Sequence, residues 1–161
     1  MRPNRLSESI LKPLAALLLF LGLLMVQGGS APLLAEPNPF EKERIEAQAL
    51  AAFKVIIGLW REELYFELYE FGMESTRNRI KRDQFAQRMV ELSWVPKGKL
   101  NPKYLKTRFH YRTMIYVDAR VEYRHKFNPS ETFSKDHTFL LMEEDGIWRI
   151  DLVKLVRAPF A

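Results

Sequence analysis

The 161-residue sequence contains no cysteine. This absence excludes a disulfide framework, a thiolate zinc site and a cysteine nucleophile. Export remains possible without disulfides, because a domain of this length can fold on its apolar core alone. Glycine is scarce too, with seven residues. The sequence has no glycine-rich phosphate loop, no nucleophile elbow and no histidine–glutamate metal motif.

An excess of charge of one sign is also missing. The whole chain carries a formal charge of +5, and residues 1–35 supply +2 of it, which leaves about +3 for the remainder. This is too little to predict a nucleic-acid partner, which requires a clustered basic face. Two basic clusters do occur, and we expect a solvated surface at both, with anionic lipid headgroups or a polyanionic partner as the alternative. Their members are Arg77, Arg79, Lys81, Arg82 and Arg88, and then Lys97, Lys99, Lys103, Lys106 and Arg108.

The N-terminal residues have the order of parts of a signal peptide. Arg2, Arg5 and Lys12 are basic, residues 14–26 form a thirteen-residue apolar run, and small or polar residues follow at 27–31. A helix that spans a bilayer needs about 20 apolar residues, so the run is short for one. We therefore expect a signal peptide over 1–35, cleaved after Ser30 or Ala35, and a periplasmic or secreted protein. An uncleaved signal anchor is the alternative.

The next part of the chain has helical periodicity. Residues 36–40 contain two prolines and are expected to form a linker. From Glu41 to Trp60, apolar residues recur at steps of three and four, which predicts an amphipathic helix. Further helices are expected over 61–71 and 81–92, with polar, irregular chain at 73–79 and a long connection at 94–104.

In the C-terminal part of the chain, apolar and polar residues alternate instead. From Thr107 to Phe127 the odd positions are mostly apolar or aromatic and the even positions mostly charged or polar, which is typical of a half-buried antiparallel sheet. Twenty-one residues exceed an ordinary strand, so we expect a turn or bulge near Val117–Asp118, or one long bent strand. Asp145–Gly146 between two apolar runs predicts a hairpin with a type I′ turn. Its second strand is expected to place Trp148, Ile150 and Leu152 on one side. Helices first and strands last indicate an α+β fold, with the N-terminal helices packed on one face of the sheet.

Four stretches together resemble the nuclear transport factor 2-like superfamily, a cone-shaped α+β roll also called cystatin-like. They are residues 60–69 (WREELYFELY), 79–85 (RIKRDQF), 118–121 (DARV) and 145–150 (DGIWRI). The resemblance implies a single domain over 41–161 with a curved antiparallel sheet, in an exported member of the superfamily. It also implies a cavity between the sheet and the first helices. Some members are isomerases or dehydratases, and many exported ones are binding or assembly modules, so the fold alone does not choose the function.

Aromatic residues are the candidate lining of this cavity. On the expected phases Trp60, Tyr69, Tyr111, Tyr123 and Trp148 point inward, where tyrosine hydroxyls would orient a small apolar or amphipathic ligand. The alternative is that the same side chains simply pack the core.

Titratable residues provide few candidates for a catalytic role. His125 lies in phase with the inward aromatics and is the candidate acid–base residue, with a strand-end histidine of structural role as the alternative. Asp118 and Asp151 fall on the polar phase, and no aspartate–tyrosine pair emerges from the spacing. No two histidines have the spacing of zinc ligands, so neither a metal nor a cofactor is expected.

The sequence thus favours a non-catalytic exported binding or accessory domain. It would bind a small ligand in the cavity, or an envelope protein through the outer face of the sheet. The alternative is a small isomerase or hydratase with acid–base chemistry in the cavity. A homodimer through the sheet is a further possibility, with salt bridges from the polar phase. That phase carries Arg112, Arg120, Glu122 and Arg124.

Overall fold

Helix α2 (Pro39–Arg61) is the element on which the sheet packs. The side chain of Asn38 accepts a hydrogen bond from the Glu41 amide and caps the helix, and Pro39 is tolerated at the first position because no partner is needed there. The helix therefore begins before Glu41, and the expected linker over 36–40 is wrong for its last two residues. The expected apolar stripe is confirmed: its buried residues are Ile45, Ala49, Phe53, Ile56, Ile57 and Trp60.

The computed structural model describes residues 36–160. The chain divides into a unit Met1–Glu36 and a unit Pro37–Ala161, and the second contains all of the helices and strands described. The expected signal peptide over 1–35 lies outside the described residues. Within the part of the chain that is described, no helix has the length and hydropathy needed to cross a membrane.

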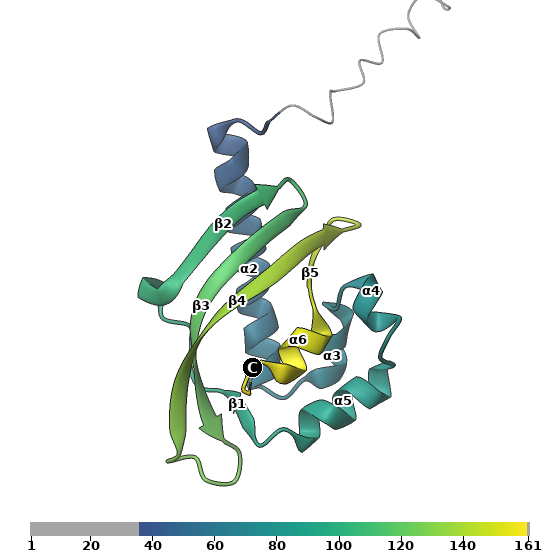
Figure 1. Ribbon diagram of the computed structural model, residues 1–161, viewed down its shortest axis with the longest axis vertical. Helices are drawn as coiled ribbons and strands as arrows, with labels where there is room; N and C mark the ends of the chain where they lie inside the picture. The colour runs from purple at the N-terminus through teal and green to yellow at the C-terminus, as the bar shows by residue number, and fades with distance from the viewer. Residues whose placement is uncertain (1–35, 161) are drawn as a thin grey trace, which may run out of the picture. The chain divides into compact units, whose positions relative to one another are not determined.

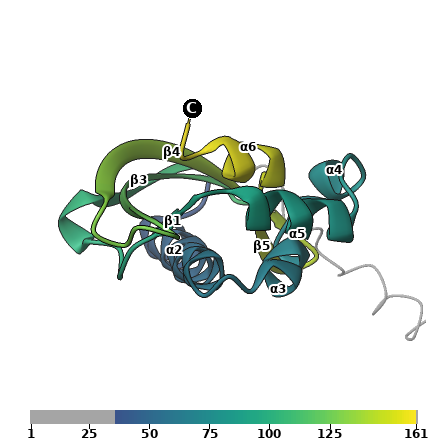
Figure 2. The same ribbon diagram turned by 90° about the horizontal axis from the view of Figure 1, so that it is seen from below.

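Four shorter helices gather beside the end of α2 (Figures 1 and 2). They are α3 (Tyr65–Glu70), α4 (Glu74–Arg77), α5 (Arg82–Glu91) and the C-terminal α6 (Leu152–Arg157). The helix expected over 61–71 is interrupted, because Glu63 has a φ of 59° and turns the chain between α2 and α3. The segment at 73–79, expected to be irregular, contains the short helix α4.

Five strands form one antiparallel sheet that curls around α2 as a half-barrel (Figure 1). The strands are β1 (Trp94–Pro96), β2 (Leu105–Tyr111), β3 (Met114–His125), β4 (Thr132–Glu144) and β5 (Ile147–Ile150). Their order is β1-β3-β4-β5, and β2 also pairs with β3. Figure 2 shows α2 on the concave face only, so the opposite face of β2, β3 and β4, the outer sheet face, is not covered by it. The α+β fold with a curved antiparallel sheet is thus confirmed.

Two details of the sheet differ from the expectation. The turn lies at Arg112–Thr113, between β2 and β3, and not near Val117–Asp118. The register shifts between Phe109 and Tyr111, which takes Tyr111 out of phase and leaves it 60% exposed. In addition, β1 lies within the stretch expected to be a plain connection.

The last hairpin is confirmed, but its second strand is short. Asp145 and Gly146 have φ values of 54° and 77°, as a type I′ turn requires. The strand ends at Ile150, because the side chain of Asp151 accepts hydrogen bonds from the amides of Val153 and Lys154 and starts α6. Leu152, expected in the strand, is therefore a buried residue of this helix.

Candidate functional site

The space between α2 and the sheet is filled by aromatic side chains. Trp60 and Tyr123 are fully buried and meet edge to face, with 5.8 Å between ring centroids. Phe53 and Phe139 also meet across the interface, with tilted rings whose centroids are 5.1 Å apart. Such pairs add to the burial of apolar surface, so this region of the molecule is a packed core.

The five residues expected to line a cavity do not share one. Trp60, Tyr123 and Trp148 are buried in the core, whereas Tyr111 is exposed at the end of β2. The hydroxyl of Tyr69 donates to the carbonyls of Arg77, the last residue of α4, and of Ile80. The alternative, that these aromatics pack the core, holds for the three buried ones.

The candidate acid–base groups have structural partners. Nδ1 of His125 accepts a hydrogen bond from the Asn128 amide at 3.1 Å and so orders the turn after β3. Asp118 lies on the outer sheet face and receives two bonds from Arg108, at 2.7 and 3.0 Å. These bonds hold the pKa of Asp118 below its usual range, so it stays ionised. Asp151 caps α6. In the described residues, therefore, the carboxylates of both aspartates have structural partners, and neither is hydrogen-bonded to a tyrosine.

A histidine–tyrosine pair does occur, at His137 rather than at His125. Nε2 of His137 lies 3.0 Å from the hydroxyl of Tyr123, and the Tyr123 ring stacks on Phe133. Burial lowers the pKa of His137 and raises that of Tyr123, so both groups are neutral at pH 7. Sequence analysis missed this pair because it depends on the register of β3 with β4, which sets Ala119 opposite His137.

The described part of the sheet has a break in one edge. Both β1 and β2 pair with the same edge of β3, and between them Arg120 and Val121 have no strand partner on that side. The last hydrogen bond before the gap runs from the Lys97 amide to the Glu122 carbonyl, at 2.7 Å. The chain from Lys97 to Tyr104 spans the gap and includes the 3₁₀-helix η1 (Pro102–Tyr104). We call this gap and its spanning segment the sheet break.

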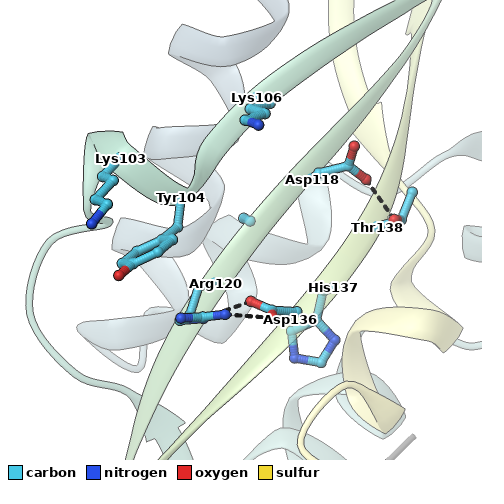
Figure 3. A pocket seen from close by; sticks show the side chains of 9 residues that line it. Lys103, Tyr104, Lys106, Asp118, Arg120, Asp136, His137 and Thr138 are labelled. Atoms are coloured by element: carbon cyan, nitrogen blue, oxygen red, sulfur yellow. Dashed lines mark hydrogen bonds and ion pairs between the residues drawn. The ribbon is translucent and has the colours of Figure 1, made fainter.

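Hollows lie around the sheet break. One of about 150 Å³ lies within it, between Ile57 of α2, Val121 and Tyr104. A more open one of about 410 Å³, the outer hollow, lies on the outer sheet face (Figure 3). It is lined by Lys103, Tyr104, Lys106, Asp118, Ala119, Arg120, Asp136, His137 and Thr138.

Arg120 organises the outer hollow. Its guanidinium donates two hydrogen bonds of 2.7 Å to the carboxylate of Asp136 (Figure 3) and lies 4.3 Å from the ring centre of Tyr104. This pairing keeps the pKa of Asp136 below its usual range. The bidentate ion pair and its contact with the tyrosine ring hold charged groups in defined positions at the base of the hollow.

The second basic cluster of the sequence surrounds this site. Lys97 pairs with Glu122 at 2.9 Å, and Arg108 pairs with Asp118. Among the described residues, Lys99, Lys103 and Lys106 form no ion pair with a carboxylate. The rim of the sheet break therefore carries an excess of positive charge. Within residues 36–160, no three His, Asp or Glu side chains are grouped so that they would hold a metal ion.

Comparison with known proteins gives no match to this chain, either among protein-family models or among curated proteins. The structure itself establishes an α+β fold with a curled antiparallel sheet.

Proposed function

We propose that this chain is a non-catalytic exported binding domain of the nuclear transport factor 2-like superfamily, and that it binds an envelope protein through the outer hollow and the sheet break. The observation that carries the proposal is the contrast between a packed interior and an open, charged surface at one place. Helices followed by a curled antiparallel sheet support the superfamily. The apolar run at 14–26 supports export.

The chemistry of the outer hollow favours a protein partner with acidic groups. Arginine and tyrosine are enriched where protein interfaces gain most of their binding energy, and Arg120 with Tyr104 combines the two. The lysines at the rim would attract carboxylates and speed association. Two of the groups expected to bridge a homodimer already have partners within the chain: Arg120 pairs with Asp136, and Glu122 with Lys97.

Site-directed photocrosslinking in cells tests this proposal. A photoreactive phenylalanine analogue replaces Tyr104 in the full chain, and the matched control carries it at Val90, which is 60% exposed on α5. We expect a discrete crosslinked product from position 104 alone, and its loss when Arg120→Ala is added. A product of twice the chain mass identifies a homodimer. Equal crosslinking at both positions, or none at 104, contradicts the proposal.

The pair of His137 and Tyr123 favours a second candidate function, a small isomerase or hydratase. His137 is half-buried and is one of the residues around the outer hollow, and its ring lies beside Tyr123 and Phe139. The test is turnover of a panel of unsaturated carbonyl compounds, followed by ultraviolet absorbance. An enzyme of this kind would lose about a hundredfold or more of its kcat in His137→Gln. Absence of turnover across the panel in the parent protein leaves the binding function.

A further inference from the structure

A groove lies between the last turns of α2 and the chain of the sheet break. It has a volume of about 350 Å³, and we call it the α2 groove. Its apolar lining is Ile57, Gly58, Leu100 and Pro102, and its cationic lining is Lys54, Arg61 and Lys99. The groove shares no lining residue with the outer hollow. This volume lies within the range of small-ligand sites, at its lower end.

Gly58 is the unusual residue of this groove. It lies inside a helix, where glycine costs about 0.5–1 kcal/mol relative to alanine. Nothing in the fold requires it there, since a Cβ built on Gly58 meets no atom within 4 Å and its φ is helical. Its missing side chain leaves open space on the α2 side of the groove.

Of the three cationic side chains around the groove, one forms an ion pair and two do not. Arg61 pairs with Glu62 at 2.8 Å and donates to the Gly98 carbonyl at 3.1 Å, so it holds the spanning segment against α2. Among the described residues, Lys54 and Lys99 form no ion pair. One is on the helix and the other on the opposite wall, so an anion in the groove has a cation on either side.

We infer that the α2 groove is a binding site for a small amphipathic anion. An apolar chain or ring lies over Ile57, Gly58 and Leu100, and its single acid group lies between Lys54 and Lys99. This site is distinct from the outer hollow, although the segment from Lys97 to Tyr104 borders both the groove and the sheet break. The apolar lining excludes purely polar anions as good ligands, and the two lysines disfavour neutral apolar molecules.

An NMR titration of the ¹⁵N-labelled protein tests the inference with defined probes. Octanoate and octyl phosphate are the amphipathic anions, 1-octanol is the neutral control and acetate the polar one. We expect saturable shifts of the Gly58, Gly98 and Leu100 amides with the first two probes only. The tighter of the two identifies the head group as carboxylate or phosphate.

Three variants locate the binding. Gly58→Leu fills the groove and is expected to weaken binding at least tenfold. Ala47→Leu adds the same side chain at an exposed position of α2, about 16 Å away along the helix, and is expected to bind as the parent does. The double variant Lys54→Gln, Lys99→Gln is expected to weaken octanoate binding by about fivefold or more. It removes the attraction between the two ammonium groups and the carboxylate, which is modest because the groove is open to water. Thermal unfolding confirms that each variant folds.

The inference is overturned by any of three results. These are shifts that do not saturate, a folded Gly58→Leu protein that binds as tightly as the parent, or 1-octanol binding as tightly as octanoate.

Discussion

Gly72 lies where the chain leaves α3 and meets the last strand, and replacing it by alanine is expected to destabilise the protein. Its neighbours Phe71 and Met73 exchange backbone hydrogen bonds with Ile150, at 2.8 and 2.9 Å, so the chain is fixed against β5. A Cβ on Gly72 would lie 2.6 Å from Cγ of Leu152, nearer still to its Cδ1, and 3.0 Å from the Tyr69 carbonyl oxygen. Leu152 is fully buried and has little room to move.

The size of the effect follows from two opposing contributions. Forcing a methyl group into a packed core costs about 1–3 kcal/mol. Replacing glycine restricts the unfolded chain and returns about 0.4–1 kcal/mol. We therefore expect Gly72→Ala to lower the free energy of unfolding by about 1–2 kcal/mol. Gly58→Ala is the matched control, because the same change in open space on a helix should raise that free energy by about 0.5–1 kcal/mol.

Urea unfolding followed by circular dichroism measures both variants, with the slope m unchanged if only the folded state is affected. A double-mutant cycle then identifies the clash. Leu152→Ala removes the atoms that Gly72→Ala would meet, so the double variant should be about 1–2 kcal/mol more stable than the sum of the single changes predicts. The reasoning is refuted if Gly72→Ala is as stable as the parent, or if the two changes add without coupling.

Three further predictions use the same unfolding measurement. Trp60→Ala should cost about 3–5 kcal/mol, because it empties the centre of the contact between α2 and the sheet; a loss below 1 kcal/mol would mean that this centre is not packed. Asp151→Ala should cost about 1 kcal/mol by removing the cap of α6, and an unchanged stability would contradict that capping role. The pKa of His137 is lowered from 6.5 by burial, so the unfolded chain binds its proton more readily, and stability should fall as the pH drops below about 6.5 and level off below the lowered pKa. His137→Gln should flatten this part of the pH profile, and an unchanged slope would assign the effect to other groups.

The features that sequence analysis predicted are those with strong local patterns. The stripe on α2 repeats over many turns, and Asp145–Gly146 satisfies a backbone need that few residue pairs meet. The features that it missed depend on one residue overriding a pattern. Tyr111 follows the alternation in sequence, yet a register shift turns it outward. Asp151 continues a strand pattern, yet its carboxylate finds two free amides and starts a helix.

The location of the candidate site could not be predicted from the sequence, because it depends on which strands pair with each other. The basic cluster from Lys97 to Arg108 is visible in the sequence as a group of charges. The sequence does not show where these charges lie in space. Because β1 and β2 pair with the same edge of β3, the lysines of the cluster surround the gap between the two strands. Periodicity could not decide whether a cavity lies between the helix and the sheet. The phases of Trp60 and Tyr123 were right, but periodicity says only that a side chain points inward, not whether space remains there.

The sequence of the spanning segment explains why no strand pairs with this part of the edge of β3. A strand that continued β1 into β2 would need an amide donor at each alternate residue, and proline has none. Pro96 ends β1, Pro102 starts η1, and Gly98 between them has a φ of 63°, which takes the chain away from the sheet. The spanning segment therefore bulges outward at Arg120 and Val121, and the opening is a consequence of three residues rather than of loose packing. The same segment borders both the α2 groove and the hollow within the break, and Gly98, Lys99 and Leu100 line both.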